Sequence, residues 1–215
     1  MLTRRFRLLF PLLLATLAPT LHATSPEVDA GWILGKLARP APMSTPFVEL
    51  RGSRLLKKPL RIEGEYARPA GDTLVRQVRA PYVETSTIKA GSVTIARGGA
   101  AHTYSLDRAP QLAGQQNSFG ALLSGDRAQL ERAFRVDSEG TRERWTLRLT
   151  PKDARMAAYV RGLTLFGRGA ELRCIETTPV KGDLQRTLLA GAAVAATGVD
   201  DAARLSTLCR GDAAR

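Results

Sequence analysis

The chain has 215 residues, 44% of them hydrophobic and 24% charged, with a formal net charge of +12. This length is enough for one domain with a sizeable buried core. Strong basic charge can indicate nucleic-acid binding or attraction to an anionic membrane surface. Here 26 of the 32 basic residues are arginines, scattered along the chain rather than clustered. We therefore interpret the charge as background composition, and leave attraction to lipid head groups open.

The first 23 residues follow the order of a secretory signal peptide. Three arginines precede an uncharged, leucine-rich run from Leu8 to Leu21, and Leu21-His22-Ala23 places a small residue at the cleavage position. The run is short for a membrane span, which needs about 20 apolar residues. We predict that residues 1–23 are cleaved and that residues 24–215 form a single periplasmic domain; an uncleaved anchor is the alternative. Because an exported protein seldom meets nucleic acid, we expect no nucleic-acid partner.

The mature chain begins with the pattern of a helix start. Ser25-Pro26-Glu27 combines a capping hydroxyl, a proline at the first helical position and an acid near the positive end of the helix dipole. The proline-rich segment at Arg39-Pro40 ends the helix. Its expected buried stripe is Val28, Trp32, Ile33 and Leu37.

From residue 47 to residue 106 the pattern changes to short extended runs. Apolar and charged residues alternate with period two, which is typical of strands with one buried face. Glycine-containing turns at 71–72, 90–91 and 98–99 separate several of these runs, so we predict an antiparallel meander. The expected strands are Phe47–Arg51, Leu60–Tyr66, Leu74–Val78, Tyr82–Ile88, Val93–Ala96 and His102–Leu106.

Residues 109–134 interrupt this rhythm with apolar residues at helical spacing around a Ser124-Gly125-Asp126 break, so we predict two helices. Extended runs then resume, and a small alanine-rich helix near Leu188–Val194 and a helix start at Asp200-Asp201 complete the chain. The whole predicts an α+β fold with one large antiparallel sheet. The later strands are expected at 134–136, 144–150, 160–166, 170–178 and 184–188.

Two cysteines, Cys174 and Cys209, are the only ones in the chain. In an oxidising compartment a pair is expected to be bonded, which would tie the C-terminal segment to the strand that carries Cys174. Two free thiols are the alternative.

The sequence offers few residues that could form a catalytic site. His102 is the only histidine left after removal of the leader, so a histidine-rich metal site cannot be built. The sequence contains no Gly-x-Ser-x-Gly elbow, no phosphate-binding loop of Walker type and no Cys-x-x-Cys pair. We therefore predict no enzymatic activity, no cofactor and no metal site. The apolar face of the sheet must instead be covered by helices, which leaves either a hydrophobic cavity or a solid core.

The order of the elements resembles the LolA-type outer-membrane lipoprotein carriers, including their divergent LolA-related branch. Each motif is short, and the resemblance lies in their order over about residues 27–188. After the exported N-terminus and the leading helix, the matching segments are Phe47–Arg51, Leu56–Gly64, Tyr66-Ala67-Arg68-Pro69, the helices at 109–134, Phe134–Val136 and Trp145–Pro151.

The resemblance implies an incomplete antiparallel β-barrel, a strongly curved sheet whose concave hydrophobic face is covered by helices. It implies a monomeric carrier that shuttles the acyl chains of a lipoprotein or lipid between membranes, with docking proteins at the inner and outer membranes. A periplasmic lipid-sensing or assembly module that contacts a membrane protein is the alternative.

The resemblance also implies site residues. In the family the arginine of the aromatic-x-Arg-Pro element holds the helical lid closed until cargo enters. The resemblance assigns this role to Arg68. The alternative is that Arg68 is a solvated arginine before a turn proline. The expected lining of the cavity is Leu60, Ile62, Leu74, Val93, Ile95, Leu112, Phe119, Leu122, Leu123, Trp145, Leu147 and Leu149.

Overall fold

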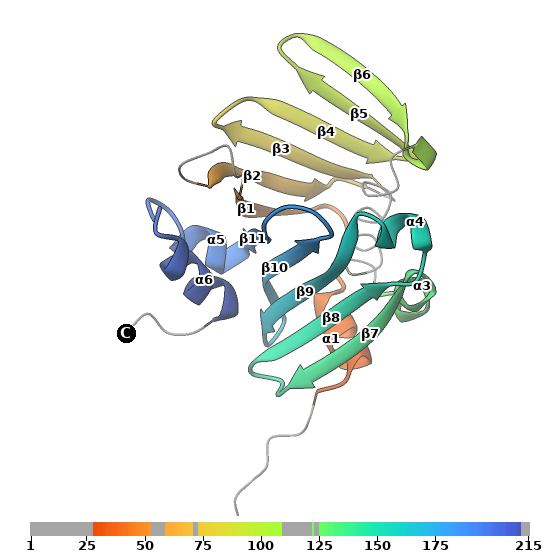
Figure 1. Cartoon of the computed structure of the whole chain (residues 1–215), viewed down its shortest axis with the longest axis vertical. Coiled ribbons are helices and arrows are strands. Elements are labelled where there is room, and N and C mark those ends of the chain that lie inside the picture. The colour runs from red at the N-terminus through yellow and green to blue at the C-terminus, as the bar shows by residue number, and fades with distance from the viewer. Residues whose placement is uncertain (1–27, 53–58, 71–72, 109–121, 123–124, 212–215) are drawn as a thin grey trace, which may run out of the picture.

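The structure is a computed structural model that describes residues 28–52, 59–70, 73–108, 122 and 125–211 (Figure 1). These residues form one open, strongly curved sheet of 11 strands, in which every neighbouring pair is antiparallel. The α+β class and the curved sheet predicted from the sequence are confirmed.

The strands run in the order β6-β5-β4-β3-β2-β1-β11-β10-β9-β8-β7. The chain's first and last strands therefore pair at the middle of the sheet, and β6 and β7 form its two edges. β6 and β7 follow one another along the chain, although they form opposite edges of the sheet. The strands are β1 (Met43–Arg51), β2 (Leu60–Arg68), β3 (Leu74–Ala80), β4 (Glu84–Lys89), β5 (Ser92–Arg97), β6 (Ala100–Ser105), β7 (Phe134–Gly140), β8 (Trp145–Pro151), β9 (Val160–Arg168), β10 (Glu171–Pro179) and β11 (Gln185–Leu189).

Alternation along β1 separates the two faces of the sheet. Phe47 joins the core cluster of the concave face, whereas Val48 and Leu50 join a second cluster on the convex face. The helices divide in the same way. On the concave face, α1 (Ala30–Leu37) and α3 (Arg127–Ala133) pack on the sheet, and α5 (Ala190–Ala195) and α6 (Ala202–Arg210) cover the convex face.

The first helix starts later than the sequence predicts. It begins at Ala30, and the side chain of Asp29 caps it by accepting a hydrogen bond from the backbone N–H of Trp32. Asp29 supplies the same oxygen acceptor that a serine cap would supply, and Ser25-Pro26-Glu27 lies outside the described residues. Ile33 and Leu37 are buried as expected, and Leu34 adds to that stripe.

All eleven predicted strands are confirmed, with bounds that differ by a few residues. Of the predicted helices at 109–134, the described part contains α3, capped by Asp126, and the buried residue Leu122. Two short elements were not predicted, η1 (Leu106–Arg108) and α4 (Ala154–Ala157). No helix in the described part of the chain is both long and apolar enough to cross a membrane.

The convex face is closed by two cross-links. A disulfide joins Cys174 on β10 to Cys209 on α6. Arg61 on β2 donates hydrogen bonds to the carbonyls of Ala196 (2.8 Å) and Val199 (2.6 Å), just after α5. Ala196 is the C-cap of α5 and Val199 lies three residues beyond it, so the guanidinium ties β2 to the segment that follows this helix. Asp201 caps α6, as the sequence predicts.

Candidate functional site

Two pockets on the concave face are lined by residues that the structure describes. The larger, which we call the apolar pocket, has a volume of about 420 Å³, within the range of roughly 300–1,000 Å³ that is usual for small-molecule sites. It lies between the end of α1, the starts of β1, β3 and β10, and the end of β2. Its apolar wall consists of Leu37, Met43, Tyr66, Leu74, Leu122, Leu172 and Leu189.

Strand register assembles this wall. Thr45 on β1 lies opposite Tyr66 on β2, and Met43 lies opposite Arg68, so that the start of one strand and the end of the next share a face. The rim of the apolar pocket is polar and includes Arg39, Arg168 and Glu171. Arg39 donates a hydrogen bond to the carbonyl of Ala170 (3.2 Å), which ties the segment after α1 to the β9–β10 turn.

The second pocket, which we call the charged pocket, has a volume of about 240 Å³ and shares Tyr66 and Leu74 with the apolar pocket. The two pockets are therefore adjacent. The charged pocket combines apolar side chains from β5, β9 and β10 with four charged ones. Those four are Glu49, Arg51, Arg76 and Glu84.

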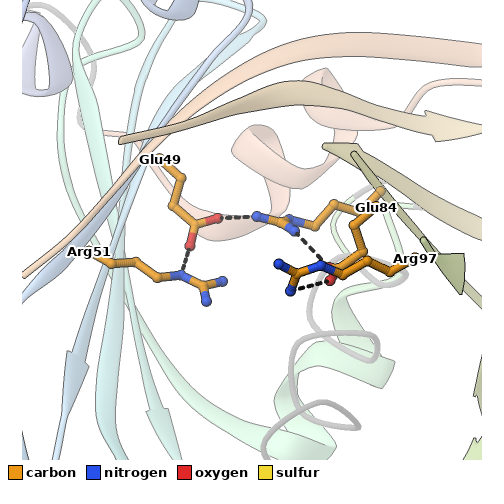
Figure 2. A network of polar contacts seen from close by, with 5 residues as sticks. Glu49, Arg51, Glu84 and Arg97 are labelled. Atoms are coloured by element: carbon orange, nitrogen blue, oxygen red, sulfur yellow. Dashed lines mark hydrogen bonds and ion pairs between the residues drawn. The ribbon is translucent and has the colours of Figure 1, made fainter. Parts of the chain in front are cut away.

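These four side chains and Arg97 form the charged network (Figure 2). Glu49 is the centre of its buried part, because one carboxylate oxygen accepts from Arg76 at 2.9 Å and the other accepts from Arg51. Arg76 and Arg97 also reach Glu84, at 3.9 and 4.0 Å. Glu49 is only 6% exposed and Arg76 15% exposed, so each buried charge is compensated by a partner of opposite sign.

Aromatic rings complete the surroundings of Arg76. Its guanidinium carbon lies 4.8 Å from the centre of the Phe47 ring, a cation–π contact in the core. Burial, and secondly the negative charge of Glu49, raise the pKa of Tyr66 to about 12, although Arg76 acts in the opposite direction. Tyr66 is therefore a neutral phenol at physiological pH, and it forms part of the wall of both pockets.

The predicted lining residues fall into three groups. Leu74 and Leu122 line the apolar pocket, and Leu74, Val93 and Ile95 line the charged pocket. Leu112, Phe119 and Leu123 lie outside the described residues. The remaining five line neither pocket: Ile62, Trp145, Leu147 and Leu149 are buried in the concave core cluster, and Leu60 packs against it.

The packing of Trp145 explains why the concave face is filled at β8 and β9. A Cβ atom placed on Gly167 would lie 1.9 Å from the indole ring of Trp145, so the ring lies directly on a glycine backbone. The indole N–H donates to the carbonyl of Gly169 at 2.9 Å. Because the indole occupies the space that a side chain would take, β8 and β9 form solid core here.

Arg68 is the last residue of β2, opposite Met43. Its Nε atom is buried and has no hydrogen-bond partner among the described residues. The lid segment that its predicted role requires lies largely at residues 109–124, of which the structure describes only Leu122. The latch role of Arg68 therefore stays a prediction.

The charged network was not predicted. Period-two alternation places Glu49 and Arg51 on the same face as Phe47, which is the signal that could have identified them. His102, by contrast, is exposed on the edge strand β6. No group of three or more potential metal ligands occurs among the described residues.

Comparison of the sequence with protein-family models identifies one family. The model of a family described as outer membrane lipoprotein carrier protein LolA-like matches residues 22–213. No curated protein sequence matches the chain.

Three solved structures are similar in fold. The LolA superfamily protein NE2245 from Nitrosomonas europaea aligns with 13% identity and a TM-score of 0.40, over 76% of this chain and 91% of that chain. LprF from Mycobacterium bovis aligns with 14% identity and a TM-score of 0.34, over 78% and 94%. A chain of the MucA/MucB complex from Pseudomonas aeruginosa aligns with 19% identity and a TM-score of 0.38, over 75% and 56%.

Proposed function

The chain belongs to the LolA-like family of outer-membrane lipoprotein carriers, and on this premise we propose that it is a periplasmic carrier of acyl chains. It binds the acyl chains of a lipoprotein or lipid in the apolar pocket and shuttles them between membranes. The signal-peptide pattern of residues 1–23 supports the location. The proposal includes no catalytic step and no cofactor, and it requires a donor protein at the inner membrane and an acceptor at the outer membrane.

The observation that carries this proposal is the apolar pocket itself. Its wall consists of aliphatic side chains and one neutral phenol, and its volume of about 420 Å³ suits a ligand rather than a few waters. Each methylene group moved from water into such a wall contributes about 0.8 kcal/mol. Binding alone can therefore hold an acyl chain without any covalent step.

The direct test is mass spectrometry of lipid extracted from protein purified from its native periplasm, together with titration of the delipidated protein with a fluorescent fatty-acyl probe. We expect a co-purifying acyl lipid and saturable uptake of the probe, at one site per chain. Failure of the delipidated protein to take up any acyl probe would contradict the carrier role.

The same protein preparation distinguishes the carrier from the alternative function. A lipid-sensing or assembly module would form a stable complex with a membrane protein and would not transfer its lipid to acceptor vesicles. A carrier is expected to release the probe to such vesicles, because shuttling requires that the cargo leave.

A further inference from the structure

We propose that the charged network is a binding site for the anionic head group of an acyl lipid, a phosphate or carboxylate, whose chain lies in the apolar pocket. This inference rests on the proposed function and names the class of cargo. It makes the concave face a site with two compartments, one apolar and one cationic.

The two compartments are contiguous. Tyr66 and Leu74 line both pockets, so a ligand that passes these two side chains would reach from the apolar wall to the charged network. An amphiphile needs this arrangement, because its chain must leave water and its head group must keep polar partners.

The charges of the network do not cancel. Three guanidiniums, of Arg51, Arg76 and Arg97, face two carboxylates, of Glu49 and Glu84, which leaves one positive charge. An anion placed among them completes the charge balance. A neutral head group would leave this excess charge to be hydrated by water alone, without an ionic partner.

Arg51 and Arg97 have the donors to hold that anion. A guanidinium carries five N–H donors. Arg51 uses its Nε on Glu49, and Arg97 makes one contact with Glu84 at 4.0 Å and stacks on Tyr82. They are 44% and 60% exposed, in contrast to Arg76 at 15%. Figure 2 shows the two side chains pointing toward one another from opposite sides of the network.

Their fixed position favours oxyanion binding. Glu49 holds Arg51 from one side, and the Tyr82 ring, 4.4 Å from the Arg97 guanidinium carbon, supports Arg97 from the other. A planar guanidinium matches the oxygens of a phosphate or carboxylate with two parallel hydrogen bonds. Since Glu49 and the Tyr82 ring already restrict these side chains, less side-chain entropy is lost when the anion binds.

The test compares three probes that share a 16-carbon acyl chain: anionic lysophosphatidylglycerol, zwitterionic lysophosphatidylcholine and neutral monoacylglycerol, each by displacement of a fluorescent acyl probe. We expect the delipidated protein to bind the anionic probe about tenfold more tightly than the neutral one, the equivalent of one charged hydrogen bond. In the R51Q/R97Q variant the network charge changes from +1 to −1, and this preference disappears while binding of the neutral probe remains.

The control is R148Q. Arg148 lies on the opposite face of β8, where it forms two 2.6 Å hydrogen bonds to Glu139. It lines neither pocket, so R148Q removes one of the two positive charges that R51Q/R97Q removes, but outside both pockets. The anionic preference should persist in R148Q, and its loss there would overturn the proposal because a general charge effect would explain it. R39Q tests the rim of the apolar pocket, and a preference lost in R39Q but kept in R51Q/R97Q would also overturn it.

Three further outcomes separate the head-group site from the carrier proposal. Equal affinity for the anionic and neutral probes overturns the head-group site and leaves the carrier role standing. Displacement of the anionic lipid by inorganic phosphate at millimolar concentration overturns it in favour of a free-anion site. If none of the three lipids binds, the carrier proposal itself has failed, and the head-group site fails with it.

Discussion

Arg76 on β3 reaches across β2 to form a 2.9 Å ion pair with Glu49 on β1, on the face of the sheet that carries the main core. The pair lies over the Phe47 ring and beside Tyr66. A carrier cavity needs only apolar walls, so a buried ion pair here is a cost that the fold sustains.

The first prediction concerns this pair. R76L leaves Glu49 buried with Arg51 as its remaining partner, and we expect it to lower the free energy of unfolding by about 3 kcal/mol. E49L/R76L removes both charges and should cost clearly less, because no buried carboxylate is left without its main partner. Urea unfolding followed by circular dichroism measures both, and equal losses in the two variants would contradict the prediction.

The second prediction concerns pH. Folding raises the pKa of Tyr66 from 10.0 to about 12, so the folded state holds this proton more tightly than the unfolded chain. The resulting stability is present below pH 10 and is lost as the pH rises toward 12, by about 1.4 kcal/mol for each pKa unit of difference. Y66F should lack this loss. The measurement is the difference in unfolding free energy between wild type and Y66F at pH 9 and 11.5, and parallel curves would show that Tyr66 titrates normally.

The third prediction concerns the apolar pocket. L172D places a carboxylate in the wall of this pocket, and we expect affinity for a fatty-acyl probe to fall by at least about tenfold. The carboxylate must either lose its hydrating water or retain that water inside the pocket, and both oppose binding of the acyl chain. V83D makes the same kind of change at a side chain that is 75% exposed and should bind the probe as wild type does. Equal binding by all three proteins would place the acyl chain elsewhere.

The fourth prediction concerns Arg68. If this residue latches a lid, R68L should change the rate of probe transfer to acceptor vesicles by about tenfold, the equivalent of one charged hydrogen bond, with a smaller effect on folding. R79L is the matched control, because Arg79 is 62% exposed and pairs with Glu65 at the surface. Stopped-flow fluorescence measures the transfer, and a wild-type rate in R68L would remove the latch role.

Much of the fold could be predicted from sequence because its strands alternate clearly. Trp145-Thr146-Leu147-Arg148-Leu149 places every second residue in the core, and the structure buries these three apolar side chains almost completely. Alternation shows which way a side chain points, but it does not show whether the space in that direction is hollow. The indole of Trp145 fills that space because Gly167 offers no side chain, a fact about a partner strand that no local pattern contains.

Alternation could place Glu49 and Arg51 on the core face, but it could not show which charged side chains they meet there. The members of the charged network come from β1, β3, β4 and β5, and their meeting depends on the pairing Tyr66↔Arg76 and Glu84↔Arg97. Each charge alone looks like one of many on a strongly basic chain. Only strand order and register bring Arg76 to Glu49, and register is a property of pairs of strands rather than of either one.

The central pairing of β1 with β11 has a consequence for biosynthesis. β1 ends at Arg51 and β11 begins at Gln185. β1, which lies in the middle of the finished sheet, is therefore synthesised long before its partner β11. Until then, β1 presents unpaired backbone N–H and C=O groups to any other extended chain. Contacts of such long sequence separation also slow folding, so this strand edge stays exposed to aggregation until the last strand is complete.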